Sequence, residues 1–262
     1  MSTPTVKSYE DSAVVIAGGS SGVGLASAFG FLGAGVTRLG LLSRNPERGE
    51  AARDRVLERH PEATVEFVPV DVNHPDQVAK AIESAHDQLG SIDVLVSSVS
   101  AAYRPELLHS IAAEDFAAIV NGQALPPMYL TRAVLPLMQQ QGGGSIINIA
   151  SDAAKVPTPG ESVLGAAMAA IVMFSRTAAM EAKRNGIRVN ALTPSLIAGT
   201  PTADRVLSDG FSKSLFEKAS RMAHLGVAEP EDLAEMVVFL GGPGSARMTG
   251  QVISINGGIS AG

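Results

Sequence analysis

Short apolar runs rich in β-branched residues alternate with longer segments of helical periodicity along almost the whole chain. A strand that is apolar at successive positions, rather than at alternate ones, is buried on both faces. Such strands separated by helices are typical of a parallel sheet that helices cover on both sides. The pattern therefore predicts an α/β fold, a doubly wound parallel sheet, with strands at Ser12–Ala17, Thr37–Ser43, Thr64–Val70, Ile92–Ser97, Gly144–Ala150, Ile187–Leu192 and Gln251–Ile255.

The chain is expected to form a single domain, residues 1–262, because it has neither an internal repeat nor a Pro/Ser-rich linker. Residues 1–11 are expected to be a flexible leader. Residues 193–226, with scattered Pro, Gly and Ser, are expected to form a loop region on the substrate side. Pro126-Pro127 lies inside a helical pattern and predicts a bend or a broken turn. Other helices are predicted at Gly22–Leu32, Pro46–Glu58 and Pro75–Gln88.

Composition excludes several classes of function. The net charge is −6 and no basic stripe compensates it, so nucleic acid is not expected as a partner. The chain has no cysteine, so it has no disulfide and no thiolate site, and its five histidines are too scattered to predict a metal site. The sequence contains no run of about 18 apolar residues, so we do not expect a membrane span. The polar start lacks the layout of a secretory signal, and we expect a cytoplasmic protein.

The sequence GGSSGVG directly follows the first predicted strand and opens the first helix. Its glycines permit a tight turn and a close approach of the backbone to a pyrophosphate, and the helix N-terminus offers unpaired N–H groups. An ordinary left-handed turn is the alternative. The strand–turn–helix context favours a Rossmann-type dinucleotide site, formed by Gly18, Ser20, Ser21, Gly22, Val23 and Gly24.

The end of the second strand bears on the choice of cofactor. A carboxylate there would bind a ribose 2′-hydroxyl and repel a 2′-phosphate, but Ser43 and Arg44 stand in its place. A hydroxyl and a guanidinium suit a phosphate dianion, so NADP(H) is favoured over NAD(H), the alternative being a solvated surface arginine. Asp71 and Val72, after the third strand, are expected beside the adenine, although Asp71 is equally suited to capping the following helix.

Several motifs together resemble the short-chain dehydrogenase/reductase family from about Ser12 to Ile259. They are AGGSSGVG for the phosphate turn, GGGSIINIAS for the fifth strand with its serine, and GIRVNALTPS with the C-terminal third. The resemblance adds Pro194 and Ile197, after the sixth strand, to the expected cofactor residues. It also implies a small-molecule substrate and a homodimer or homotetramer.

The family's chemistry implies an Asn, a Ser, a Tyr and a Lys in the active site, and only the serine, Ser151, is matched here. The Asn position falls on Gln123, the Tyr position on Leu164 and the Lys position on Met168. In the register of the enoyl-reductase branch, Glu161 takes the Tyr position and Met168 still takes the Lys position. The resemblance therefore implies a member with a degenerate active site.

A leucine cannot donate a proton, and a methionine has neither a charge nor a donor for the ribose. Ser151 and Gln123 retain hydrogen-bonding groups, and Tyr103, after the fourth strand, is the candidate replacement acid. Three functions stay open. The first is an NADP(H)-linked oxidoreductase acting on an alcohol, a ketone or an activated alkene with a non-standard proton source. The others are a non-catalytic or regulatory subunit that pairs with an active paralogue, and a non-redox isomerase, dehydratase or cyclase.

Overall fold

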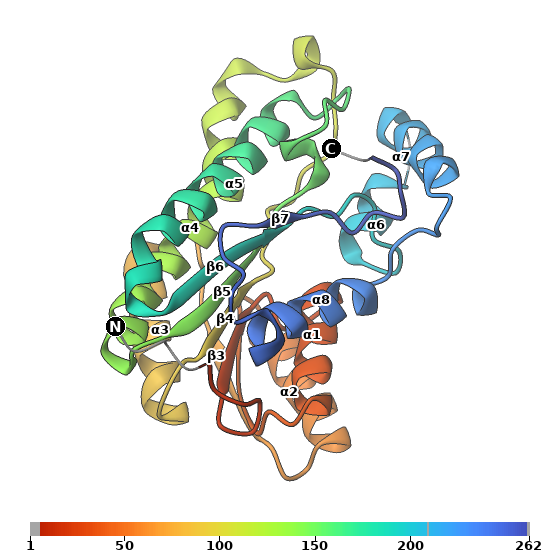
Figure 1. Cartoon of the computed structure of the whole chain (residues 1–262). Coiled ribbons are helices and arrows are strands. Elements are labelled where there is room, and N and C mark those ends of the chain that lie inside the picture. The colour runs from red at the N-terminus through yellow and green to blue at the C-terminus, as the bar shows by residue number, and fades with distance from the viewer. Residues whose placement is uncertain (1–5, 209, 261–262) are drawn as a thin grey trace.

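A computed structural model describes residues 6–208 and 210–260 of the chain. Its centre is a parallel sheet (Figure 1). The strand order is β3-β2-β1-β4-β5-β6-β7. The doubly wound α/β fold predicted from the alternating pattern is thereby confirmed. The strands are β1 (Ala13–Ala17), β2 (Arg38–Ser43), β3 (Thr64–Pro69), β4 (Val94–Ser97), β5 (Gly144–Ile149), β6 (Ile187–Leu192) and β7 (Val252–Ile253).

Helices cover both faces of the sheet, as the continuously apolar strands require (Figure 1). One buried cluster joins the sheet to α3 (Pro75–Leu89), α4 (Phe116–Gln141) and α5 (Ser162–Ala182). A second joins the other face to α1 (Gly22–Gly33), α2 (Pro46–Arg59) and α8 (Pro230–Gly241). The remaining helices, α6 (Pro201–Val206) and α7 (Gly210–Met222), precede α8 in the chain.

The sheet topology determines where a ligand can bind. The strand order runs outward from β1 in both directions, so the connections that follow β1 and β4 leave the sheet on opposite sides. In open parallel sheets this reversal opens a crevice beyond the carboxyl ends of the strands. The glycine turn follows β1 and the segment bearing Tyr103 follows β4, so both lie at this edge.

Three local expectations are corrected by the structure. Helix α4 is continuous through Pro126 and Pro127, and no broken turn forms. Both prolines are buried, and we attribute the continuity of the helix to packing that offsets the two missing N–H donors. Residues 193–226 are not mainly loop, because α6 and α7 occupy much of the segment, residue 209 being outside the described residues. Within the expected leader, Tyr9 packs against the core and its hydroxyl donates to the Val238 carbonyl at 3.0 Å, whereas residues 1–5 are outside the described part.

Helix α5 continues into a 3-10 turn (Lys183–Asn185), and the segment Ser162–Asn185 is long and apolar enough to cross a membrane by length and composition alone. Half of the apolar window is buried inside the protein, against α4 and β6. Its buried side includes Ala167, Ile171 and Ala179. These contacts are typical of a core helix in a soluble protein.

Candidate active site

The turn between β1 and α1 is built so that only glycine fits at two of its positions. Gly18 has φ +82°, and a Cβ there would lie 2.2 Å from the Ser98 carbonyl oxygen. A Cβ on Gly24 would lie 2.2 Å from the Gly18 carbonyl oxygen. Ser21 precedes the helix in an extended conformation and its side chain makes no cap hydrogen bond. The start of α1 therefore keeps the N–H donors that an anion would use.

The carboxyl end of β2 carries an unpaired polar atom. The Ser43 hydroxyl oxygen is buried and has no hydrogen-bond partner among the described residues, and the exposed Arg44 follows it. Ser97, at the end of β4 and in register with Ala17, has a second buried hydroxyl without a described partner. Buried hydroxyls are normally paired, so an unpaired one beside a crevice indicates where a ligand's acceptor fits. Ser97 was not among the predicted site residues.

Asp71 lies near Arg44 but does not cap the next helix. The N-cap of α3 is His74, and Asp71 instead accepts hydrogen bonds from the backbone and side-chain nitrogens of Asn73, at 3.1 and 2.7 Å. Partial burial raises the pKa of Asp71, but the Asn73 hydrogen bonds and the Arg44 charge outweigh it and lower the pKa. The capping alternative is therefore wrong. Val72, the other residue expected beside the adenine, is buried.

The two expected cofactor residues after β6 fix the backbone at the same edge. The Pro194 carbonyl accepts a hydrogen bond from the Asp152 N–H at 2.8 Å, and Ile197 forms an isolated parallel bridge with Ala228. Asp152 is itself buried, and its carboxylate accepts hydrogen bonds from the C-terminal segment, including one of 2.7 Å from Asn256. It holds this segment in place and is not among the residues lining the cavity described below.

An apolar cluster occupies the position where proton-transfer groups were expected. Leu164 and Met168 are buried on α5 and pack with Ala124, Ala167 and Ile171. Tyr103 packs against this cluster, as do Ala150 and Ala154, which lie on either side of Ser151 in the chain. The Ser151 hydroxyl accepts a hydrogen bond from the Ala153 N–H at 3.3 Å. The structure thus brings Tyr103, and the segment that carries Ser151, to the same cluster as Leu164 and Met168.

A cavity of about 420 Å³ opens beside this cluster, lined by residues that include Ala101, Tyr103, Arg104, Ile119 and Gln123. The Tyr103 hydroxyl donates to the Gly160 carbonyl at 2.9 Å. Gln123, only 4% exposed, donates its amide to the Ala101 carbonyl at 3.1 Å and accepts from the Ala101 N–H at 3.4 Å. Gln123 therefore holds the segment after β4 through both ends of its amide.

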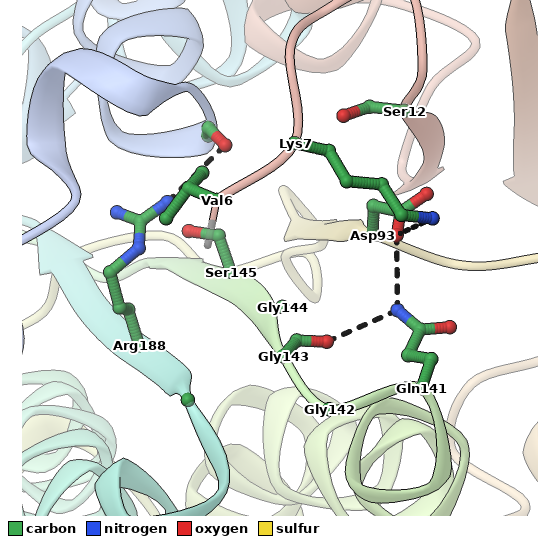
Figure 2. Close-up of a pocket in the computed structure, with 12 residues that line it drawn as sticks. Val6, Lys7, Ser12, Asp93, Gln141, Gly142, Gly143, Gly144, Ser145 and Arg188 are labelled. Atoms are coloured by element: carbon green, nitrogen blue, oxygen red, sulfur yellow. Dashed lines mark hydrogen bonds and ion pairs between the residues drawn. The ribbon is translucent and has the colours of Figure 1, made fainter. Parts of the chain in front are cut away.

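A smaller cavity of about 50 Å³ lies at the opposite edge, where strands begin (Figure 2). Lys7 pairs with the Asp93 carboxylate at 2.8 Å, and the Gln141 amide donates to Asp93 at 3.2 Å and to the Gly143 carbonyl at 3.1 Å. Arg188 lines the other side of the cavity and bonds backbone carbonyls. The polar groups here bind one another, so we assign this edge a stabilising role.

Comparison with known proteins agrees with the fold and the turn. The enoyl-(acyl carrier protein) reductase family model matches residues 17–260. A 3-oxoacyl-(acyl-carrier-protein) reductase of Chlamydia pneumoniae is 33% identical over 94% of this chain and 96% of its own. The chain belongs to the short-chain dehydrogenase/reductase family.

Two solved structures are instructive relatives of this short-chain dehydrogenase/reductase. The L-sorbose reductase of Gluconobacter frateurii, in complex with NADPH and L-sorbose, is 31% identical, with a TM-score of 0.84 over 97% of this chain and 98% of its own. An NADPH-bound short-chain oxidoreductase of Pseudomonas aeruginosa, described as containing an atypical catalytic center, is 25% identical, with a TM-score of 0.88 over 97% and 98%.

Glu161 takes the tyrosine position only in the register of the enoyl-reductase branch, but its environment in the structure is unusual. It is 8% exposed, and burial, opposed by a hydrogen bond with the Thr158 hydroxyl and reinforced by the Asp152 charge, raises its pKa to about 7. In turn, burial first and the Glu161 charge second raise the pKa of Tyr103. The only signal for Glu161 in the sequence is a lone carboxylate three positions before Leu164. Its burial comes from segments that are distant in the sequence.

The raised pKa predicts how stability depends on pH. Because the folded pKa, about 7, lies above the ordinary 4.5, Glu161 stabilises the fold fully below pH 4.5, and this contribution is lost as the pH rises through 7. A shift of this size corresponds to about 3 kcal/mol. We expect Glu161→Gln to exceed the unfolding free energy of the wild type by about 1 kcal/mol at pH 5 and by about 3 kcal/mol at pH 8. Urea denaturation at both pH values measures this, and equal differences at the two pH values would contradict it.

Proposed function

We propose that the protein is an NADP(H)-linked oxidoreductase acting on an alcohol, a ketone or an activated alkene, with a proton source other than a tyrosine–lysine pair. The unpaired buried hydroxyl of Ser43, with Arg44 beside it, carries the proposal. A guanidinium and a hydroxyl donor at the end of the second strand suit a 2′-phosphate, and no carboxylate stands there to repel it.

The residues of the turn fit the rest of the dinucleotide. Gly18 and Gly24 leave no room for a Cβ, because the backbone of Ser98 lies against Gly18 and the backbone of Gly18 lies against Gly24. Gly22 and Val23 begin that helix, whose first N–H groups suit a pyrophosphate. When bound, the nicotinamide supplies or accepts a hydride. The chain's own contribution is to orient it and the substrate at the edge of the cavity that Tyr103 and Gln123 line.

The test of cofactor choice is Arg44→Ala. Loss of charge-assisted hydrogen bonds to the 2′-phosphate is worth about 1.5–3 kcal/mol, so the affinity for NADPH should fall about 10- to 100-fold while that for NADH changes little. Isothermal titration calorimetry measures both cofactors. Arg55→Ala, which removes an exposed arginine from α2, serves as the matched control and should leave both affinities unchanged. Absence of NADPH binding by the wild type, or an equal loss for both cofactors, would overturn the proposal.

The apolar cluster favours one other function, a non-catalytic subunit that pairs with an active paralogue. Leu164 and Met168 contribute neither a proton nor a charge, and the Tyr103 hydroxyl already donates to a backbone carbonyl. A single-turnover assay with NADPH and a panel of ketones and activated alkenes separates the two functions. Hydride transfer to any of them supports the oxidoreductase, and NADPH binding without any transfer supports the non-catalytic subunit.

A further inference from the structure

We propose that the carboxyl group of Glu161 is the proton donor and acceptor of this site, in place of the tyrosine that the family resemblance implies. The inference rests on the proposed oxidoreductase function and names the proton source that this function lacks.

Glu161 directly precedes α5, the helix that carries the two residues in place of the family's tyrosine and lysine. Leu164 and Met168 follow it by three and seven positions, within the first two turns of that helix. Leu164 and Met168 face the apolar cluster that contacts Tyr103. The neighbouring Gly160 carbonyl receives the Tyr103 hydroxyl, so the start of α5 is joined directly to the segment that lines the cavity.

The Glu161 carboxyl group is not used for the structural purpose that its position suggests. Glu161 is the N-cap of α5, but its side chain accepts no cap hydrogen bond from the helix. Within residues 6–208 and 210–260, no lysine, arginine or histidine forms an ion pair with it. A buried carboxylate without a cation is costly, and such a group is retained more often for chemistry than for stability.

The groups that face Glu161 favour its protonated form near neutral pH. Tyr103 approaches from the segment after β4 and Asp152 from the segment after β5, and neither carries a positive charge. Thr158 offers a hydroxyl, which partly supports the carboxylate. Burial and the Asp152 charge prevail and raise the pKa of Glu161 to about 7. A general acid is most effective when its pKa lies near the working pH.

The proton step is balanced for reduction of a ketone. A bound reduced nicotinamide would supply the hydride that forms the C–H bond at the carbonyl carbon as the carbonyl π bond breaks. The Glu161 O–H bond then breaks, its proton passes to the carbonyl oxygen, and Glu161 is left as a carboxylate. The 8% of the residue that remains exposed allows water to return the proton. In alcohol oxidation each transfer runs in reverse, with the Glu161 carboxylate as the base.

The first test measures the carboxyl group itself and requires no activity. In protein labelled with ¹³C at the glutamate side-chain carboxyl carbon and assigned by triple-resonance NMR, the Glu161 signal should titrate with a midpoint near pH 7. Glu161→Gln should remove that signal alone. A Glu161 signal with a midpoint near 4.5, the ordinary value for a glutamate, would overturn the proposal.

The second test follows hydride transfer in single turnovers with NADPH and a ketone that the wild type reduces. Glu161→Gln should lower the rate about 10²- to 10⁴-fold without weakening NADPH binding, and it should abolish the fall in rate above pH 7. The control Glu181→Gln should keep the wild-type rate and pH profile. A Glu161→Gln variant that keeps the wild-type rate of hydride transfer and the wild-type pH profile would refute the role of Glu161 and leave the proposed function intact. Failure of the proposed function would instead appear in the wild type, as absence of NADPH binding.

Discussion

Replacing Gly24 by alanine is expected to abolish NADPH binding and to lower the unfolding free energy by about 3 kcal/mol. The added Cβ would meet the Gly18 carbonyl oxygen at 2.2 Å, a distance that a Cβ contact does not tolerate, and the obstacle is backbone rather than a side chain that can rotate away. The turn and the start of α1 must therefore separate. Urea denaturation with and without NADPH measures both effects, because a ligand that binds only the folded state raises its stability.

The same helix provides the control for this substitution. A Cβ on Gly33, the last residue of α1, would meet no atom within 4 Å, and Gly33 is exposed. Gly33→Ala should leave NADPH binding unchanged and alter stability by less than about 1 kcal/mol. If Gly24→Ala bound NADPH as tightly as Gly33→Ala does, the turn would not be the cofactor site.

Replacing Arg188 by methionine is expected to lower the unfolding free energy by about 4 kcal/mol. Arg188 is 5% exposed, and its Nη1 shares its hydrogens among the Leu240 carbonyl at 2.7 Å, the Ser245 carbonyl at 3.1 Å and the Ser245 hydroxyl at 2.6 Å. These acceptors lie at the end of α8 and just beyond it, where helix carbonyls lack partners within the helix. Methionine fills part of the volume but donates no hydrogen bond, so the Leu240 carbonyl keeps only its bonds from the Ser145 and Ser245 hydroxyls and the Ser245 carbonyl only its bond from the Met248 N–H.

Arg38→Met is the matched control for the loss of an arginine that binds backbone carbonyls. Arg38 donates to the Leu89 carbonyl at 2.7 Å and to the Asp11 carbonyl at 2.8 Å, but it is only half-buried, so water can replace it. We expect a loss of about 1 kcal/mol. Thermal and urea unfolding compare the two variants. If Arg188→Met were no less stable than Arg38→Met, burial of the carbonyls would not increase the loss of unfolding free energy.

Much of the fold was predictable because its signals are local. Continuous apolar runs identified the strands, and β6 agreed with the prediction at both ends (Ile187–Leu192). The boundaries of the shorter strands were predicted too wide, as at Gln251–Ile255, where only Val252–Ile253 pairs with a neighbour. Residues at strand ends look apolar in sequence whether or not a partner strand reaches them. The helices α6 and α7 were missed because scattered Gly, Pro and Ser suggested loop, although Pro201 stands at the start of α6, where proline is tolerated.

The sequence by itself determined the α/β class, the glycine turn, the Ser43–Arg44 pair at the second strand and the absence of a tyrosine and a lysine on α5. Each depends on residues that are neighbours in the chain or related by a helical or strand repeat. Only the tertiary structure decided that Gln123 clamps the segment after β4, that Asp152 holds the C-terminal segment and that Glu161 is buried beside Tyr103. Burial and charge are set by segments far apart in the chain, so no local pattern specifies the pKa of a carboxyl group.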